Sequence, residues 1–238
     1  METAQIKRSL GFKAVDELVR SGMKLGLGTG STAIEAVRRL GERVREGSLR
    51  DIKAVATSFQ TVVACQELGL SLMSLNDPAI DGCLDLTIDG ADEVDPRWML
   101  IKGGGAAMLI EKIVAHASRD FCIIVDSSKL VSRLGEKARV PVELVPEALI
   151  PVRRSLEALG GQPELRMARM KVGPVITDHG NFVLDVRFPQ DFEPRQMERE
   201  IMAIPGVMAH GIFTRPVTDL LVGWPDGRIE HRRGPPGI

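Results

Sequence analysis

The sequence has no excess of charge of either sign and no long hydrophobic segment. Its 238 residues carry 31 Lys and Arg against 32 Asp and Glu, a formal net charge of −1. This balance provides neither a basic field for nucleic acid nor a polybasic membrane anchor. No apolar run approaches the ~20 residues of a membrane span, and the first residues lack the apolar core of a signal peptide. We therefore expect no nucleic-acid partner and no membrane attachment.

Cysteine is also scarce. The chain has three cysteines, which are odd in number, unpaired in their spacing and set among apolar residues: Cys65, Cys83 and Cys122. This pattern is typical of reduced core cysteines in a cytoplasmic protein. Hydrophobic residues make up 44% of the chain and charged residues 26%, as in ordinary globular proteins. The length allows one large domain or two small ones.

In the first half of the chain, short apolar runs alternate with segments that favour helices. The expected strands are 23–27, 52–57, 71–74, 83–88, 98–101 and 121–126, and the expected helices are 7–20, 33–40, 60–68 and 106–117. Strands that alternate with helices predict a Rossmann-like α/β fold, a parallel sheet with helices on both faces.

From about Ala138 onward the order of the expected elements changes to strand, helix, two strands, helix, strand. The segments are 140–145, 146–159, 164–170 with 175–177, 182–188, 194–203 and 206–213. This order predicts a small ferredoxin-like α+β domain over 139–213, inserted into a main domain of 1–138 and 214–238. Residues 217–224 would return to the main sheet, and the tail with Arg232, Arg233, Pro235 and Pro236 is expected to be frayed.

The stretch from Thr87 to Lys112 gathers polar residues where two expected strands end. Asp89 and Asp92 follow the first strand, and Lys102 with three consecutive glycines follows the second. In open parallel sheets, ligands bind beyond the carboxyl ends of the strands. Three glycines cost backbone entropy, which close approach of their N–H groups to an anion would offset. A flexible turn is the alternative.

A second glycine-containing turn, Gly28–Thr32, joins an expected strand to an expected helix. Its amides and its hydroxyl side chains would suit a phosphate group. Gly28, Gly30 and Ala33 also match a relaxed dinucleotide-binding pattern. That pattern requires an acidic residue near the end of the next strand, and Ser58 and Phe59 stand there instead. We therefore expect no nucleotide cofactor.

Four motifs follow one another along the chain: the turn Gly28–Thr32, the turn Asp89–Glu93, the loop and helix Lys102–Lys112, and the pair Ser128-Lys129. This is their order in ribose-5-phosphate isomerases of the A type, and the chain resembles this family over nearly its whole length. The resemblance implies conversion of D-ribose 5-phosphate to D-ribulose 5-phosphate in the pentose phosphate pathway. It also implies at least a homodimer.

The resemblance further implies roles for individual residues. Glu111 would be the catalytic base, assisted by Lys102, Asp89 and Asp92. The residues that would bind the sugar phosphate are Lys7, Thr29, Gly30, Ser31, Thr32, Asp89, Gly90, Ala91, Asp92, Lys102, Gly103, Gly104, Gly105 and Lys129.

These residue types suit an aldose–ketose isomerisation, which moves a proton between C1 and C2 through a cis-enediolate. One carboxylate can remove and return that proton, an effect typically worth ~10²–10⁴-fold. Lys102 and the glycine amides could stabilise the enediolate oxygen. Asp89 and Asp92 could act at the sugar hydroxyls and ring oxygen during ring opening, or could merely form turns.

A divalent metal is an alternative, because Glu93 and Asp95 add two carboxylates that could otherwise face water. However, the four histidines, His116, His179, His210 and His231, lack the spacing of metal ligands, so we expect no metal. Two other functions fit parts of the sequence. A sugar-phosphate sensor would need neither Glu111 nor Lys102, and it would be expected to carry a basic DNA-binding segment. An acyl-CoA transferase relative would use a glutamate as a nucleophile.

Overall fold

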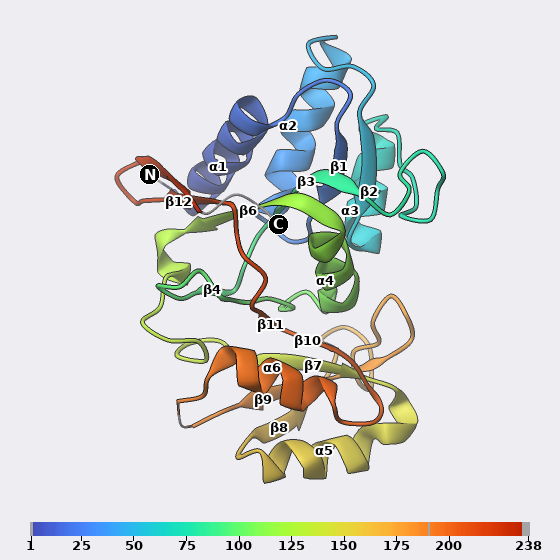
Figure 1. The fold of residues 1–238 in the computed structure, drawn as a ribbon, viewed down its shortest axis with the longest axis vertical. Coiled ribbons are helices and arrows are strands. Elements are labelled where there is room, and N and C mark those ends of the chain that lie inside the picture. Colours follow the sequence, from blue (N-terminus) through green and yellow to red (C-terminus); the bar gives the residue numbers. More distant parts are fainter. Residues whose placement is uncertain (1, 190, 235–238) are drawn as a thin grey trace. The chain divides into compact units, whose positions relative to one another are not determined.

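The computed structural model describes residues 2–189 and 191–234, which pack into two compact units (Figure 1). The first unit contains the chain up to Ala91, Ile113–Lys129 and the chain from Arg215 onward. The second contains Asp92–Lys112 and Leu130–Thr214. The domain boundaries after residues 138 and 213 stay a prediction. No helix in the described part of the chain is long and apolar enough to cross a membrane.

The first unit is built on a six-stranded sheet with the order β13-β12-β6-β3-β1-β2. Its strands are β1 (Lys24–Leu27), β2 (Lys53–Ala56), β3 (Leu84–Asp89), β6 (Ser118–Asp126), β12 (Asp219–Gly223) and β13 (Ile229–Arg233). Neighbouring strands are parallel except for β12 and β13, which form an antiparallel pair. The predicted α/β fold class is confirmed.

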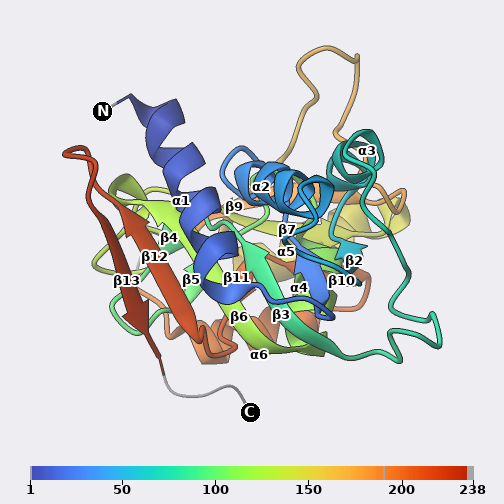
Figure 2. The same ribbon diagram turned by 90° about the horizontal axis from the view of Figure 1, so that it is seen from above.

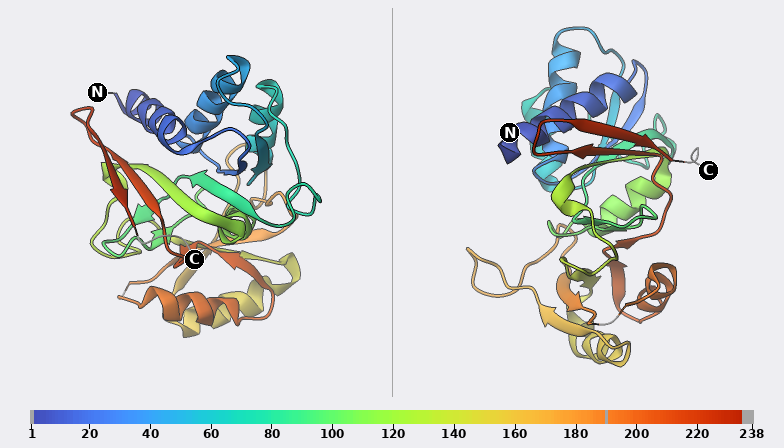
Figure 3. Two further views of the ribbon diagram at one scale, coloured as in Figure 1. Left: turned by 45° about the horizontal axis from the view of Figure 1, so that its top comes forward. Right: turned by 90° about the vertical axis from the view of Figure 1, so that its left-hand side faces the viewer.

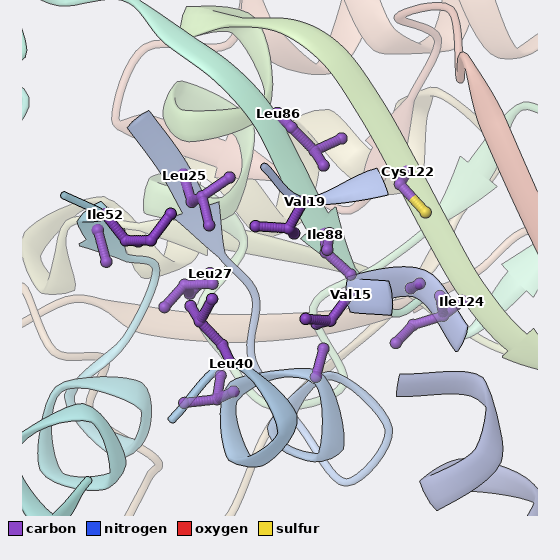
Figure 4. Packing of buried hydrophobic residues seen from close by; sticks show 14 of the residues in the cluster. Val15, Val19, Leu25, Leu27, Leu40, Ile52, Leu86, Ile88, Cys122 and Ile124 are labelled. Atoms are coloured by element: carbon purple, nitrogen blue, oxygen red, sulfur yellow. The ribbon is translucent and has the colours of Figure 1, made fainter. Parts of the chain in front are cut away.

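Three helices pack against one face of this sheet, as Figure 2 shows from above: α1 (Thr3–Leu18), α2 (Ala33–Arg45) and α3 (Phe59–Glu67). Alternate strand residues such as Leu25, Leu27 and Ile88 point into the core beneath them, because successive side chains of a strand face opposite sides (Figure 4). Residues between them face the other side, where a Cβ on Gly26 would lie 2.5 Å from Cγ1 of Val114 in α4 (Met108–Ala117). Helices therefore cover both faces.

The second unit contains a four-stranded antiparallel sheet with the order β10-β7-β9-β8. Its strands are β7 (Val140–Leu144), β8 (Gln162–Leu165), β9 (Phe182–Arg187) and β10 (Val207–His210). Two helices, α5 (Leu149–Ala158) and α6 (Pro194–Met202), share one hydrophobic core with β7 and β9 (Figure 3). This confirms the predicted ferredoxin-like order of strands and helices.

A three-stranded antiparallel sheet completes the second unit: β11 (Ile212–Phe213), β5 (Leu100–Ile101) and β4 (Glu93–Val94). The sequence predicted one strand over 206–213, but the chain changes sheets at Gly211. A Cβ at Gly211 would lie 2.2 Å from the carbonyl oxygen of Lys102 and 2.5 Å from Cδ of Pro141. Only glycine therefore allows the chain to pass between these two neighbours.

Three other local predictions need correction. The expected frayed tail instead forms β13 over Ile229–Arg233, which is paired along its length with β12, whereas Pro235 and Pro236 lie outside the described residues. The expected strands 71–74 and 175–177 are absent from the named strands, and Leu72 forms only an isolated bridge with Ala54. Cys83 is exposed rather than in the core. Cys65 is buried as expected, and burial raises the pKa of its thiol to about 11.

Candidate active site

The turn Gly28–Thr32 in the first unit is held against the end of β3. Gly28 donates its N–H to the carbonyl oxygen of Ile88 (3.0 Å), and Thr29 donates its N–H to Oδ1 of Asp89 (3.1 Å). A Cβ on Gly28 would lie 2.1 Å from the same Oδ1 atom, so glycine is required there by close approach of the carboxylate. Asp89 is fully buried, and its Oδ1 also accepts the N–H of Gly90 (2.7 Å). One carboxylate oxygen therefore fixes two turns of the chain.

The hydroxyl of Thr29 belongs to a cluster of hydroxyl groups. It lies 2.7 Å from Oγ1 of Thr57 and 2.7 Å from Oγ of Ser58. Thr61 donates to the carbonyl oxygen of Gly28 (2.8 Å), and Thr57 donates to that of Leu27 (3.0 Å). Sequence reasoning assigned the Thr29 hydroxyl to a ligand. The structure shows that this hydroxyl holds the turn against the start of α3.

Two further predicted residues of the first unit, Ser31 and Lys7, contact each other. The Nζ atom of Lys7, in α1, donates to Oγ of the exposed Ser31 (2.8 Å). Thr32 is the N-cap residue of α2 and makes no side-chain cap bond, and Gly30 has φ +99°. A lysine ammonium group, a hydroxyl group and a helix N-terminus thus meet at one place, which is a favourable environment for an anion. Lys129 ends the short 3₁₀ helix η1 (Ser127–Lys129) after β6. Ala91 is half-buried at the end of the first segment of this unit.

In the second unit, Lys102 and Glu111 form a buried ion pair. Nζ of Lys102 donates to Oε1 of Glu111 (3.0 Å), and the two side chains are 2% and 5% exposed. Lys102 is held by its own backbone N–H, which donates to the carbonyl oxygen of Gly211 (2.9 Å), and Glu111 lies in the first turn of α4. A carboxylate near a helix N-terminus is favoured by the helix dipole. The structure therefore brings the predicted base and the predicted lysine into direct contact.

The loop Gly103–Gly105 packs against Asp92. Gly104 donates its N–H to Oδ2 of Asp92 (2.8 Å), and a Cβ on Gly104 would lie 2.8 Å from Oδ1 of that carboxylate. Gly103 has φ +97°, a conformation that side chains disfavour. Glycine is thus needed at position 103 for its backbone conformation and at position 104 for the close approach of Asp92. A flexible turn alone does not explain these two glycines.

Sequence reasoning missed Arg166, which contacts the opposite side of this loop. Its Nη1 donates to the carbonyl oxygens of Gly103 and Gly104, both at 3.1 Å. Asp185 in β9 holds the guanidinium through two bonds, at 2.8 Å and 2.5 Å. No sequence motif marks Arg166, and only the strand pairing of β8 with β9 brings it near Asp185.

A second missed cluster surrounds Lys112, the residue after the predicted base. Its ammonium group donates to Oε1 of Glu198 (2.9 Å) and to the carbonyl oxygen of Ile212 (2.6 Å), and it lies 4.7 Å from the ring centre of Phe213. Burial lowers the pKa of Lys112, although Glu198 opposes this effect. His210 is buried 3.5 Å from the ammonium group; burial, aided by the charge of Lys112, lowers its pKa well below the ordinary value.

Glu93 and Asp95 do not face water, which corrects that alternative. Glu93 is fully buried and accepts the N–H groups of Gly135, Lys137 and Ala138, each at 2.6 Å. Asp95 is 5% exposed, and its Oδ1 accepts the N–H of Met99 (2.8 Å). These carboxylates fix local turns. Within residues 2–189 and 191–234, no three His, Cys, Asp or Glu side chains form a group that could hold a metal ion.

Comparison with known proteins identifies close relatives. Residues 53–227 match the model of the family described as ribose 5-phosphate isomerase A (phosphoriboisomerase A). A protein of Treponema denticola named ribose-5-phosphate isomerase A is 45% identical over an alignment of 237 positions, which covers 97% of this chain and 99% of that protein. A protein of Thermosynechococcus vestitus with the same name is 52% identical over 211 residues, 89% of this chain and 88% of that protein.

Solved structures of similar proteins share the fold. A ribose 5-phosphate isomerase A from Methanocaldococcus jannaschii has a TM-score of 0.91 and 40% identity, covering 98% of this chain and 100% of that one. A D-ribose-5-phosphate isomerase in complex with phospho-erythronic acid has a TM-score of 0.93 and 38% identity, again covering 98% of this chain and 100% of that one.

Proposed function

The chain belongs to the ribose 5-phosphate isomerase A family, and we propose that Glu111 is the general base of its reaction. The protein is an isomerase that interconverts D-ribose 5-phosphate and D-ribulose 5-phosphate. The observation that supports Glu111 is its buried contact with Lys102 (3.0 Å) beside the three-glycine loop. In the forward direction Glu111 takes the proton from C2 of the open-chain aldose, and the cis-enediolate forms. The same carboxylate then returns a proton to C1 while the hydroxyl proton moves from O2 to O1, which gives the ketose.

Lys102 and the amides of Gly103–Gly105 are proposed to stabilise the negative oxygen of the enediolate. A lysine that is already fixed by an ion pair needs little reorganisation when that charge develops. Low exposure strengthens the effect, because electrostatic interactions are stronger where water is excluded. The pair thus combines a proton acceptor and a positive charge in one rigid unit.

The turn Gly28–Thr32, with Lys7, is proposed to bind the 5-phosphate. The contact between Lys7 and Ser31 (2.8 Å) at the start of α2 supports this assignment, because it places positive charge where a helix N-terminus already favours an anion. Lys129 is proposed as a further phosphate ligand from the family motif.

Asp89 and Asp92 are proposed to act on the sugar hydroxyls and the ring oxygen, so that the furanose opens before isomerisation. Both carboxylates already accept backbone N–H groups, Asp89 from Thr29 and Asp92 from Gly104. These bonds hold each carboxylate in one orientation, which a proton relay requires. Gly90 and Ala91 connect the two and are proposed to line the same substrate.

We also propose that the protein is cytoplasmic and forms a homodimer. The free cysteines Cys65, Cys83 and Cys122 support a reducing compartment. The dimer rests on the family resemblance. Size-exclusion chromatography with light scattering, performed over a range of concentrations, measures the oligomeric state directly.

An assay with ribose 5-phosphate and no added cofactor tests the function. Formation of D-ribulose 5-phosphate, together with its loss in Glu111→Gln, is the expected result. We also expect phospho-erythronic acid to inhibit this chain, since its carboxylate resembles the planar, negatively charged enediolate. No turnover by the wild-type protein would contradict the activity, whereas full turnover by Glu111→Gln would contradict only the assignment of the base.

A further inference from the structure

We propose that Arg166, held by Asp185, is a positioning residue for the isomerisation. Arg166 fixes the two peptide groups of the Gly103–Gly105 loop so that their N–H groups point away from the guanidinium. The N–H of Gly104 then binds Asp92, and the N–H of Gly105 can bind the enediolate oxygen. This inference rests on the proposed role of the loop amides in the reaction. It adds two residues, Asp185 in β9 and Arg166 directly after β8, to the groups that prepare the site.

The argument begins with the planarity of the peptide bond. In a trans peptide, the C=O of one residue and the N–H of the next point in opposite directions. Arg166 accepts no bonds and donates to the carbonyl oxygens of Gly103 and Gly104, both at 3.1 Å. The N–H groups of Gly104 and Gly105 must therefore point away from the guanidinium.

The position of Asp92 agrees with this geometry. The N–H of Gly104 reaches Oδ2 of Asp92 at 2.8 Å, so the arginine and the aspartate hold the same peptide group from opposite sides. Arg166 also binds the next peptide group, through the carbonyl oxygen of Gly104. The N–H of Gly105 therefore points away from the arginine. Gly105 is exposed, and its N–H is our candidate donor to the enediolate oxygen.

The loop needs such external support because its own sequence does not restrict it. Three consecutive glycines have the largest conformational freedom of any residues, and Gly103 already occupies φ +97°. Donors that stabilise a transition state are effective only when they are oriented beforehand. A guanidinium that donates to two successive carbonyl oxygens restricts both peptide planes at once.

Asp185 makes the arginine itself rigid. Nε and Nη2 of Arg166 donate to the two carboxylate oxygens of Asp185 at 2.8 Å and 2.5 Å, the two-bond geometry for which a guanidinium is suited. The side chains are 16% and 21% exposed, so the pair is largely shielded from solvent. The positive charge also polarises the two peptide groups, which strengthens their N–H groups as donors.

Steady-state kinetics of Arg166→Gln, Arg166→Lys and Asp185→Asn test the proposal. For Arg166→Gln we expect kcat to fall by at least ~10-fold with KM changed by less than ~3-fold, because an interaction used in the transition state is lost. The inhibition constant of phospho-erythronic acid should rise by about the same factor as kcat/KM falls. Arg166→Lys should recover part of the loss. The fall in kcat should be smaller in Asp185→Asn than in Arg166→Gln.

Arg139→Gln is the matched control, because Arg139 forms an exposed ion pair with Glu164 beside the same sheet and does not contact the loop. It should keep the wild-type kcat. A direct readout comes from the amide resonances of Gly104 and Gly105 in ¹⁵N-labelled protein, which should shift in Arg166→Gln and not in Arg139→Gln. If Arg166 variants do not fold, the kinetics of Asp185→Asn decide the question.

A wild-type kcat in Arg166→Gln would overturn the proposal, and so would a rise in KM alone, which would indicate ground-state binding. The proposed role of Glu111 fails separately. If Glu111→Gln is inactive while Arg166→Gln behaves as wild type, only the positioning role is wrong. If Glu111→Gln remains active while Arg166→Gln loses kcat, the positioning role stands and another base must be sought.

Discussion

The Nζ atom of Lys102 lies 3.0 Å from Oε1 of Glu111, and both side chains are at least nine-tenths buried. Burying such a pair has a cost in stability, because two charges have left water. Removing one partner leaves the other charge buried, an effect that typically costs ~3–5 kcal/mol. Loss of activity in a single variant could then reflect unfolding. Experiments on this pair must therefore measure stability beside turnover.

The first prediction concerns Glu111→Gln, which keeps the size of the side chain and removes its ability to accept a proton. We expect kcat to fall by ~10²-fold or more, while substrate binding survives because the proposed phosphate site is formed by other residues. Glu157→Gln, an exposed change on α5, is the control and should behave as wild type. Near-normal turnover of Glu111→Gln would remove this residue from the mechanism.

The second prediction separates stability from catalysis. Lys102→Met should reduce kcat far more than KM, and it should lower the free energy of unfolding because Glu111 loses its buried partner. Adding Glu111→Gln to Lys102→Met should restore part of the stability and none of the activity. The free energy of unfolding in urea and the steady-state kinetics are measured for the wild type, both single variants and the double variant, which together form a double-mutant cycle. Recovery of activity in the double variant would contradict the assigned roles.

The third prediction is that activity persists after exhaustive treatment with a chelator. Lys102 can supply the positive charge that a metal ion would otherwise supply. Glu93 and Asp95, the two additional carboxylates in the motif, are already bonded to backbone N–H groups. Turnover is measured before and after chelation and after return of single divalent ions. Loss that one specific ion restores would favour a metal route.

Much of the fold was predictable because each element carries a local signal. The apolar strands, the helix-forming segments between them and the alternation of the two indicated the α/β class, and four short motifs indicated the candidate site. The change of sheet at Gly211 was not predictable, because it depends on the distant Pro141 and on the carbonyl of Lys102. Local sequence favours a strand there on both sides of the glycine.

The parts of the site that the sequence did not reveal are held by contacts between distant segments. Arg166 lies near Asp185, 19 residues along the chain, through the pairing of β8 with β9, and it donates to the glycine loop, which is more than 60 residues away in sequence. Glu93, which the sequence left as a metal ligand or a solvated group, instead binds three amides near Lys137. A carboxylate with several polar neighbours looks the same in sequence whether it binds a ligand or the protein's own backbone.

The fourth prediction concerns the phosphate. Ser31→Ala combined with Thr32→Ala should mainly raise KM, and Lys7→Met should do the same, since phosphate contacts persist from ground state to transition state. Lys13→Met, on the same helix, removes a lysine that pairs with Glu17 and should leave KM unchanged. Free ribose should bind poorly to the wild-type protein. A liganded structure with the phosphate at Gly103–Gly105 would reverse the assignment.

The last prediction concerns the dependence of stability on pH, through His210. Burial and the charge of Lys112 lower the pKa of this histidine well below its ordinary value, which favours the neutral form in the folded protein. The unfolded chain binds a proton at His210 near pH 6.5. Below that pH the unfolded state holds more protons than the folded state, so stability decreases as the pH falls. Above it, both states are neutral at this residue and its contribution is constant.

His210→Asn tests this reasoning, because the amide oxygen can still accept the N–H of Ile212 that now reaches Nδ1 at 3.2 Å. Between pH 7 and pH 5.5 we expect the wild-type free energy of unfolding to fall by about 1 kcal/mol more than that of the variant. His179→Asn, a change at an exposed turn, should keep the wild-type slope. Urea unfolding at intervals of half a pH unit measures all three proteins. If the free energy of unfolding changes equally with pH in the wild type and in His210→Asn, His210 is not neutral in the folded state. The electrostatic environment of Lys112 would then differ from the one described.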